Sequence, residues 1–395
     1  MTVVISHFVT LWRPHILPDG GSSHLFRRVA QHVSELLNLG GGLAVTLFFV
    51  LSGMVLMYNY GGPDGRLRTS ARSFYVARIA RIYPVYVLGL LVAWLPYVRW
   101  HECTGGASNC AQSNAALNGG ASLALLQAWD PLAATFWNGP AWSLSVEAFF
   151  YALFPILLPL LSGRTVSTLQ RWCVALCLVA LAFPVLYWIV LPDGPLSRSN
   201  FGSFWFSELW ANPLVHLPEF VLGMALIRIV LLRRENIPHG HREWRALALL
   251  AADLAIVIVF LPYFGFPLAL YPLSLVLALP AIGYLLFTLA QMRGPVSRVL
   301  SHPWLQALGE ASYALYLLHW PVWLWWTHLL HASPTAGGRL SGLLLFGGYL
   351  CLVIPLSLAV FYGIEQPMRR LIRQTFDRPR ATPGEVPEIA VEPAH

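Results

Sequence analysis

The 395-residue chain has few charged residues and no lysine at all. Asp, Glu, Lys and Arg make up 11% of it, whereas soluble domains usually contain about 25%. All 25 basic residues are arginine, which suits phosphate recognition but also follows from a codon-composition bias. The shortage of charge argues against an ordinary soluble protein. The basic balance requires no nucleic-acid partner, because cytoplasmic loops of membrane proteins are basic anyway.

The sequence also lacks the short motifs of several common enzyme classes. No GxSxG elbow, Walker loop, GxGxxG fingerprint or CxxC pair occurs, so a serine hydrolase is unsupported. The histidines lack metal-site spacing, and we predict neither a bound metal nor a resident cofactor. Cys173, Cys177 and Cys351 lie in apolar runs and are interpreted as packing residues. Cys103 and Cys110 share a polar loop and would pair only if that loop faces an oxidising compartment.

Apolar residues dominate what remains, at 57% of the chain with a mean hydropathy of +0.60. The apolar runs are continuous, which disfavours an outer-membrane β-barrel, and many reach the roughly 20 residues that a membrane-spanning helix needs. The run 119–129 is shorter and is predicted to be re-entrant or interfacial. We therefore predict an all-α polytopic integral membrane protein with about ten transmembrane helices. The predicted spans are a short one ending near Trp12, then 39–60, 81–100, 142–161, 171–191, 213–232, 246–263, 268–290, 311–331 and 340–362.

The arginines orient these predicted helices. With the N-terminus in the cytoplasm, 19 arginines fall on the cytoplasmic side and 6 on the outer side. The six are Arg13, Arg27, Arg28, Arg99, Arg198 and Arg339. A shift of the topology by one helix removes this asymmetry, so both termini are predicted to be cytoplasmic. The membrane domain is predicted to cover residues 1–376, and the Pro- and Glu-rich residues 377–395 to form a disordered tail.

Ionisable side chains inside apolar helices are costly and usually functional. The predicted spans contain His7, Glu147, Glu219, Asp253 and His319. His7 lies five residues before Trp12, and Glu147 lies five residues after Trp142. Both would therefore lie about 7.5 Å below the outer interface. If the two helices are adjacent, Glu147 would orient His7 and make it more basic, as a general base requires. The alternative for a lone histidine is a hydrogen-bonded packing role.

Two further polar groups lie near predicted span ends. Arg78 and Arg81 are three residues apart and share a helix face at the cytoplasmic start of a span. They are either an ordinary positive-inside anchor or a clamp for a phosphate-bearing ligand. Glu365, at a helix end beside arginines, is interpreted as a structural ion-pair partner.

A third polar group lies within the predicted span 311–331. Ser312, Tyr316 and His319 are spaced to project from one stripe of a helix. The stripe is either a buried structural network or part of a functional site.

Taken together, these residues resemble the acyltransferase 3 family, bacterial membrane acyltransferases that modify sugars and other hydroxyl-bearing acceptors. The resemblance covers almost the whole chain and rests on stretches that occur in family order. These are "VVISHF", "FFVLSGMVLM" (Phe48–Met57), "FYVARIARIYPVY" (Phe74–Tyr86), "WSLSVEAFFYALFP" (Trp142–Pro155), "HLPEFVLGMAL" (His216–Leu226), "ASYALYLLHWPV" (Ala311–Val322) and "IEQPMRR".

The resemblance implies acyl transfer from a cytoplasmic acyl-CoA, a co-substrate expected to be acetyl-CoA. His7 occupies the place of the family's catalytic histidine, and Arg78 and Arg81 match arginines linked with the acyl donor. Glu147 matches the glutamate that we expect to orient His7, and the motif Ser312, Tyr316, Leu317, His319 would contact the substrate or its oxyanion.

Two departures from the family pattern bear on the ends of the chain. The family usually has an arginine upstream of the first-helix histidine, at a position that here would precede Met1. We expect either a start assigned too late or a compromised donor site. The larger subclass carries a C-terminal SGNH hydrolase-like domain, and this chain is expected to be the standalone form.

The predicted function is O-acyl transfer from acyl-CoA to a hydroxyl of a cell-envelope or exported carbohydrate or glycolipid, in the bacterial inner membrane. The alternative acceptor is a macrolide-type natural product. A different class, a carrier or flippase of lipid-linked glycans with His7 and Glu147 as a proton relay, also fits the composition. The absence of an internal repeat weakly disfavours that class.

Overall fold

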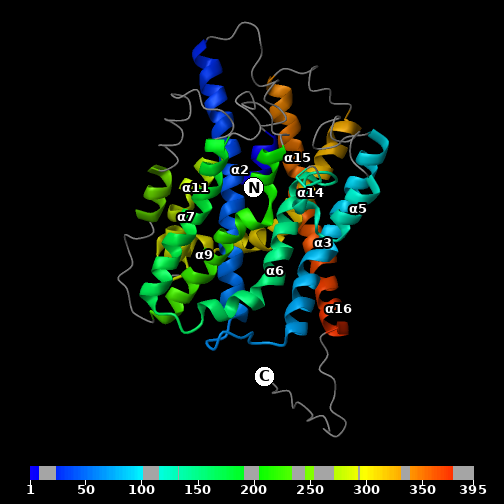
Figure 1. Ribbon diagram of the computed structural model, residues 1–395. Coiled ribbons are helices and arrows are strands. Elements are labelled where there is room, and N and C mark those ends of the chain that lie inside the picture. The colour runs from blue at the N-terminus through cyan, green and yellow to red at the C-terminus, as the bar shows by residue number, and fades with distance from the viewer. Residues whose placement is uncertain are drawn as a thin grey trace.

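The structure is a computed structural model that describes residues 1–8, 24–100, 115–131, 133–190, 204–233, 245–252, 271–291, 294–330 and 339–376. These residues are almost entirely helical, and their β-pairing is limited to an isolated bridge between Gly61 and Leu67. Residues 2–8 form a helical N-terminal segment. The longer helices are α2 (His24–Tyr60), α3 (Ala71–Trp100), α6 (Trp142–Leu161), α7 (Val166–Val190), α9 (Pro213–Leu232), α14 (Pro303–Leu329) and α15 (Arg339–Val360), drawn in Figure 1. The shorter ones are α5 (Ala115–Leu123), η1 (Gln127–Trp129), η2 (Gly139–Ala141), α8 (Phe204–Ala211), α11 (Tyr271–Leu277), α12 (Leu279–Leu289), α13 (Pro295–Leu300), the π-helix η5 (Phe361–Glu365) and α16 (Gln366–Phe376).

Seven helices in the described part of the chain are long and apolar enough to cross a membrane. They are Leu39–Tyr60, Ala71–Pro96, Gly139–Leu161, Val166–Val190, Ser207–Leu232, Pro272–Leu289 and Leu344–Phe376. Each overlaps a predicted span, and the all-α, multi-pass architecture is confirmed. The predicted span 311–331 is helical within α14 but is not among the seven. Parts of the first and seventh predicted spans lie outside the described residues, so the total of ten stays a prediction, as do the cytoplasmic termini.

Helix α3 begins about ten residues before the span predicted from hydropathy, because its first turns are polar. The Ser70 hydroxyl accepts a hydrogen bond from the backbone N–H of Ser73 at 3.1 Å and so caps the helix. Arg78 and Arg81 therefore lie well inside α3 and not at its start. Both side chains can reach the interior of the bundle from there.

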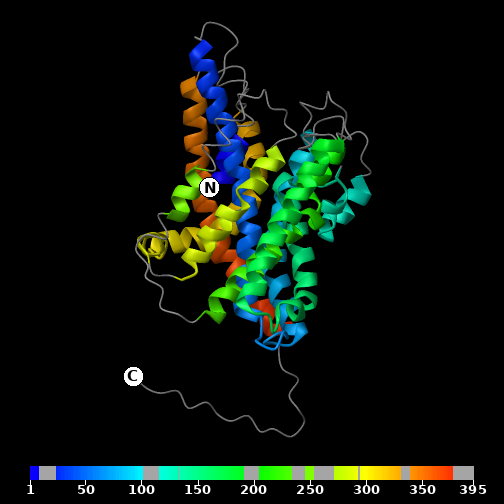
Figure 2. The same cartoon turned by 60° about the vertical axis from the view of Figure 1, so that its left-hand side comes forward.

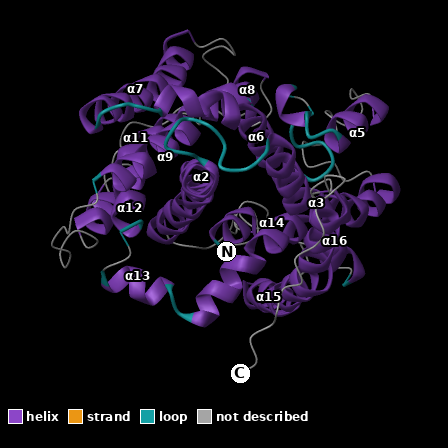
Figure 3. Ribbon diagram, turned by 90° about the horizontal axis from the view of Figure 1, so that it is seen from below, coloured by secondary structure: helices purple, strands orange, loops and turns teal. Residues whose placement is uncertain are grey.

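Helix α2 lies near the centre of the bundle, with α6, α9, α12 and α14 around it (Figure 3). It crosses α9 closely, and at this crossing a glycine of each helix faces the backbone of the other helix. A Cβ atom at Gly53 would overlap the carbonyl oxygen of Phe220, and one at Gly223 would overlap that of Val50. Small residues at such a crossing let two membrane helices approach closely.

The N-terminal segment packs against α2, α14 and α15. A Cβ atom at Gly41 of α2 would lie 2.5 Å from Ser6 Oγ, so glycine is needed for the segment to approach α2. On the other side, the ring of Phe8 stacks on Phe346 of α15, with 3.7 Å between ring centroids. Phe8 also meets Trp323 of α14 edge-on at 5.7 Å. These contacts fix the place of His7.

The predicted non-spanning run 119–129 folds back into the bundle. Helix α5 ends at Leu123, and Leu125 has a φ of 58°, which turns the chain. The Gln127 side chain is 2% exposed and donates hydrogen bonds to Tyr86 Oη at 3.2 Å and to the Ala141 carbonyl at 3.0 Å. This segment thus packs against α3 and the start of α6 without crossing.

The two ends of the bundle differ in what they present. In Figure 1 the N-terminal segment lies in the upper part of the bundle, whereas the loop 61–70 and α16 lie at its lower end. Figure 2 shows the same arrangement from a second direction. The lower end is the one that the arginine distribution assigns to the cytoplasm.

Candidate active site

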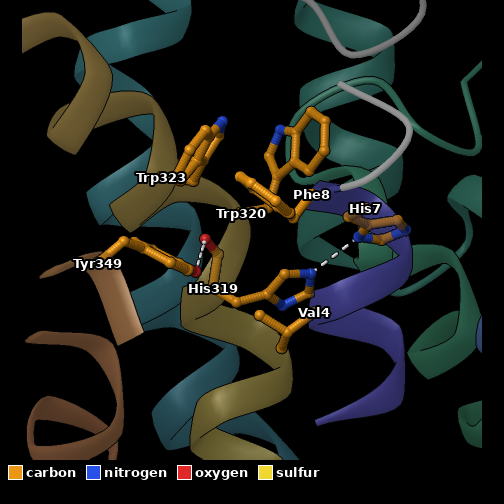
Figure 4. Close-up of a pocket in the computed structure, with 7 residues that line it drawn as sticks. All are labelled: Val4, His7, Phe8, His319, Trp320, Trp323 and Tyr349. Atoms are coloured by element: carbon orange, nitrogen blue, oxygen red, sulfur yellow. Dashed lines mark hydrogen bonds between the residues drawn. The ribbon is translucent and has the colours of Figure 1, made fainter. Parts of the chain in front are cut away.

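Two histidines from opposite ends of the chain meet inside the bundle. His7 Nδ1 lies 2.8 Å from His319 Nε2 (Figure 4). The two rings are nearly parallel, with centroids 5.1 Å apart and planes 20° apart. Trp320 meets the His7 ring edge-on at 5.4 Å. The pair joins the N-terminal segment to α14.

His319 is buried, at 2% exposure, and held on both sides. Its Nδ1 lies 2.6 Å from the backbone carbonyl oxygen of Tyr316 on the preceding turn. Its own carbonyl oxygen accepts a hydrogen bond from the Tyr349 hydroxyl of α15 at 2.6 Å. The orientation of the His319 ring is therefore fixed by α14 itself and by its packing on α15.

Pro321 removes one backbone hydrogen bond from α14 close to His319. Proline has no N–H, so the carbonyl of Leu317 loses its helical hydrogen bond. The Asn138 side chain, 2% exposed, donates to that carbonyl at 3.0 Å and replaces the missing bond. The "LLHWP" sequence thus leaves one carbonyl inside α14 without its helical partner, and the segment before α6 supplies the missing donor.

The histidine pair forms one wall of a pocket whose other walls are apolar and mostly aromatic. Figure 4 shows the lining residues, which come from the N-terminal segment, α14 and α15. They are Val4, His7, Phe8, His319, Trp320, Trp323 and Tyr349. The indole Nε1 of Trp320 is buried and has no hydrogen-bond partner among the described residues. A buried donor left unpaired costs about 1–3 kcal/mol, a cost that an acceptor atom of a ligand would remove.

Two other residues of α14, Tyr316 and Ser312, were predicted to share the site with His319. Tyr316 lies close to the histidine pair, whereas Ser312 does not. The Tyr316 hydroxyl lies 2.8 Å from Ser143 Oγ and 2.8 Å from the Pro140 carbonyl, so it links α14 to the start of α6. Ser312 is exposed and donates to the carbonyl of Gly309 in its own helix at 2.6 Å. Neither hydroxyl lines the pocket.

The expected pairing of His7 with Glu147 is wrong. Glu147 is 6% exposed and accepts hydrogen bonds from the hydroxyl of Tyr151, one turn on, and from Ser52 Oγ of α2 at 3.5 Å. His7 pairs instead with His319. Equal estimated depth did not imply contact, because the N-terminal segment packs between α2, α14 and α15 while Glu147 faces α2. Ser143, one turn before Glu147 on the same helix, bonds to the Pro140 carbonyl and the Tyr316 hydroxyl.

The two predicted donor-site arginines lie in one polar cluster with different partners. Arg78 Nη2 donates to the Tyr60 hydroxyl at 2.7 Å, and its guanidinium lies over the rings of Tyr60 and Tyr151 at 4.8 and 5.5 Å. Arg81 forms an ion pair with Glu365, which is 0% exposed. The interpretation of Glu365 as an ion-pair partner is confirmed. Tyr151 contacts both Glu147 and Arg78, so Glu147 belongs with the arginines.

Helix α14 connects this arginine cluster with the histidine pair. The Arg81 guanidinium lies 5.3 Å from the ring centroid of Tyr313, whose hydroxyl donates to the Ile82 carbonyl at 2.7 Å. Tyr313, Tyr316 and His319 follow at three-residue spacing, which covers about 9 Å along the helix. Polar side chains therefore extend from the lower end of the bundle to the pocket.

A family comparison decides what this arrangement belongs to. A family model described as an acyltransferase domain matches residues 1–362, a span that includes both histidines and both arginines. The chain belongs to the acyltransferase 3 family. It is 29% identical over 304 residues to acyltransferase MdmB of Streptomyces mycarofaciens, covering 74% of this chain and 69% of that protein. No solved structure matches.

Membership of the acyltransferase 3 family makes the chain a multi-pass membrane acyltransferase and sets the carrier interpretation aside. It is an acyltransferase of the class that transfers groups other than aminoacyl groups. No cluster of three or more His, Cys, Asp or Glu side chains that could hold a metal occurs within the described residues. Cys103 and Cys110, whose pairing was considered above, lie outside those residues. Asp253 does as well.

Sequence reasoning named Glu219 but missed its partner in this acyltransferase, His216. His216 Nδ1 lies 3.2 Å from Glu219 Oε2, and its Nε2 lies 2.9 Å from the Trp210 carbonyl. The rings of Phe49 and Trp142 pack on His216 at 5.0 and 5.6 Å. The three-residue spacing of His216 and Glu219 on one predicted helix was the signal that could have found them.

Proposed function

We propose that this acyltransferase moves an acyl group, with acetyl as the first choice, from acyl-CoA to a hydroxyl of a cell-envelope or exported carbohydrate or glycolipid. The observation that carries the proposal is the His7–His319 pair on the wall of an aromatic pocket. His7 is half-buried, and its Nε2 bonds to nothing within the described part of the chain. A histidine that has one ring nitrogen held by a neighbour and the other unbonded is the arrangement that a general base requires.

In this mechanism His7 Nε2 removes the proton of the acceptor hydroxyl while that oxygen attacks the thioester carbonyl carbon. The tetrahedral intermediate collapses by breaking the carbon–sulfur bond. The CoA sulfur leaves as a thiolate and takes the proton from the His7 imidazolium. The products are an ester and free CoA, and His7 returns to its neutral form.

The negative oxygen of the tetrahedral intermediate needs a donor. The Tyr316 hydroxyl and Ser312, both predicted from the sequence for this contact, bond to backbone carbonyls and do not line the pocket. Trp320 lines it and holds the unpaired Nε1–H. We therefore assign the oxyanion contact to Trp320, because an indole N–H can only donate.

Arg78 and Arg81 supply the phosphate-binding charge of the proposed donor site. Guanidinium groups bind phosphate oxygens through paired hydrogen bonds. Arg78 contacts Tyr60, just before the loop 61–70, and Arg81 contacts Glu365, just before α16. The pantetheine arm would follow the Tyr313–Tyr316 face of α14 toward His7. Glu147, through Tyr151, positions Arg78 in this scheme, in place of its expected role at His7.

A sequential route uses the same residues in another order. His7 Nε2 would attack the thioester itself, releasing CoA, and the acyl-histidine would then pass its acyl group to the acceptor. The routes separate on one observation, which is whether labelled acetyl-CoA without acceptor marks the protein.

The test of the proposed function is acetyl transfer by bacterial inner membranes that carry the protein. CoA release and transfer of radiolabel from acetyl-CoA to the envelope polysaccharide fraction are measured for wild type, His7→Ala and His302→Ala. His302 is an exposed histidine on the same protein and serves as the matched control. We expect His7→Ala to lose about 10²–10⁴-fold in rate, since general-base catalysis contributes about that much. His302→Ala should match wild type.

Two results would count against the proposal. Full activity of a normally inserted His7→Ala protein would reject the base role. Label that reaches no polysaccharide while a macrolide acceptor is acetylated would replace the acceptor class.

A further inference from the structure

The chain of hydrogen bonds behind His7 fixes where its protons lie. The Tyr316 carbonyl oxygen, 2.6 Å from His319 Nδ1, can only accept. His319 Nδ1 must therefore carry a hydrogen. In a neutral imidazole the other nitrogen then has none, so His319 Nε2 is an acceptor.

The same reasoning passes to the next ring. His319 Nε2 accepts, and His7 Nδ1 lies 2.8 Å from it, so His7 Nδ1 is the donor and carries the hydrogen. Neutral His7 then has no hydrogen on Nε2. That lone pair belongs to the ring nitrogen that points away from His319 (Figure 4).

We infer that His319 is a positioning residue that holds His7 in the tautomer with a free Nε2. This inference rests on the proposed base role of His7. His319 occupies the place that a carboxylate holds in a histidine–carboxylate dyad, and Glu147 bonds elsewhere. Both nitrogens of His319 are engaged, so it has no N–H left for an oxyanion. Its sequence-predicted oxyanion role is replaced by this one.

The arrangement also stabilises the charge that forms during the reaction. When His7 Nε2 takes the hydroxyl proton, His7 becomes an imidazolium whose Nδ1–H donates to a neutral imidazole. A hydrogen bond from a charged donor is roughly twice as strong as a neutral one. The neutral acceptor adds no buried negative charge to the pocket, which would be costly among Phe8, Trp320 and Trp323.

The first experiment reads the tautomer without any substrate. Full-length protein with ¹⁵N-labelled histidine rings is examined by NMR in lipid bilayers, and the His7→Ala variant identifies the His7 signals. We expect wild-type His7 to carry its proton on Nδ1 and none on Nε2. A wild-type His7 with its proton on Nε2 would overturn the inference.

The second experiment compares two substitutions of His319. His319→Phe keeps a ring but offers no acceptor, whereas the Gln Oε1 of His319→Gln can reach the place of Nε2 and accept. We expect His319→Phe to move the His7 proton to Nε2 in part of the molecules and to lower kcat between about 10-fold and 10⁴-fold, without raising the KM for acetyl-CoA. His319→Gln should restore the tautomer and most of kcat.

The outcomes distinguish the positioning role of His319 from the base role of His7. A His319→Phe protein with an unchanged tautomer and unchanged kcat would overturn the positioning role. An active His7→Ala protein would instead overturn the base role, whatever the tautomer.

Discussion

At the scale of single residues, the polar groups buried in this bundle differ in whether their hydrogen bonds are complete. His216 uses both ring nitrogens, one toward Glu219 and one toward the Trp210 carbonyl, and Thr46 adds a hydroxyl to Glu219 at 3.5 Å. Such a satisfied network stabilises the contact of α2 with α9 and offers nothing to a ligand. Trp320 is the opposite case, because its buried N–H has no partner among the described residues. Because this unpaired N–H belongs to a residue that lines the pocket, it is the donor we assign to a ligand.

Trp320→Phe tests the oxyanion contact directly. The substitution removes the N–H and keeps an aromatic ring in the pocket, so we expect kcat to fall by about 10²–10³-fold, as when a single oxyanion donor is lost. Acetyl-CoA turnover by the protein in proteoliposomes measures it.

Trp326→Phe is the matched control on the same helix. Its Nε1 donates to the Leu345 carbonyl at 3.2 Å, so its loss should lower the thermal stability and leave kcat within a factor of a few. A Trp320→Phe enzyme as fast as the Trp326→Phe enzyme would remove Trp320 from the reaction.

Residue-scale predictions from sequence were right that Glu147, Glu219 and His319 lie inside the bundle, and wrong about one central partner. Hydropathy and helical rise give a residue's depth, and they place His7 and Glu147 alike. They give no angle around the bundle, and that angle decides the partner. His7 and His319 are 312 positions apart, and no local spacing relates them. Local relations, such as Tyr151 one turn after Glu147, were available from the sequence.

At the scale of elements, the short N-terminal segment is positioned by a close contact with α2. Residues 2–8 carry His7, and the approach to α2 depends on Gly41, where a Cβ atom would lie 2.5 Å from Ser6 Oγ and 2.7 Å from Ser6 Cβ. Ser6 is the residue before His7. A shift of this segment therefore moves the base relative to His319.

Gly41→Ala should lower activity without preventing insertion. The added methyl group pushes Ser6 away, and a displacement of about 1 Å in a catalytic group can cost about 10²-fold in rate. We expect kcat to fall at least tenfold, while the amount of protein in the membrane stays unchanged.

Gly347→Ala is the control for this substitution. Gly347 lies in α15, and a Cβ atom there meets nothing within 4 Å. Alanine should be neutral or stabilising by about 0.5–1 kcal/mol, because glycine is the poorer helix residue. Equal activity of the two alanine variants would show that the α2 contact does not set the position of His7.

Element boundaries followed the sequence where apolar runs and helices coincide. Helices α6 and α9 occupy Trp142–Leu161 and Pro213–Leu232, as predicted from the apolar runs. Helices α2, α3 and α14 begin earlier than predicted, because hydropathy marks where a helix is apolar and not where its backbone hydrogen bonds start. The Ser70 cap of α3 is a local signal that the prediction did not use.

At the scale of the whole molecule, the arginine cluster and the histidine pair lie toward different ends of the bundle. Arg78 bonds to Tyr60, just before the loop 61–70, and Arg81 pairs with Glu365, just before α16. His7 belongs to the N-terminal segment, which lies in the upper part of the bundle, whereas that loop and α16 lie at its lower end (Figure 1). Substrates that approach from opposite sides would meet at His7 without either crossing the membrane. This arrangement suits a cytoplasmic donor and an acceptor that has been exported or is held in the outer leaflet.

Arg81 is central to the proposed acyl-CoA site. Its replacement alone would both weaken phosphate binding and leave Glu365 unpaired, so the two effects could not be told apart. Arg81→Ala strands the Glu365 carboxylate, which is 0% exposed and has one oxygen without a partner among the described residues. Leaving such a charge unpaired costs about 3–5 kcal/mol. The informative variant is therefore Arg81→Ala combined with Glu365→Gln, with Glu365→Gln alone as its reference.

Relative to Glu365→Gln, the double variant should raise the KM for acetyl-CoA by about 10–100-fold, the equivalent of one or two charged hydrogen bonds to phosphate. Its KM for the acceptor should not change, because the acceptor reaches His7 from the other end. Arg370→Ala, an exposed arginine of α16, controls for loss of positive charge at this end. If the double variant instead weakened the acceptor and left acetyl-CoA unaffected, the two substrates would have to exchange sides, and the predicted orientation of the bundle would fall with the donor site.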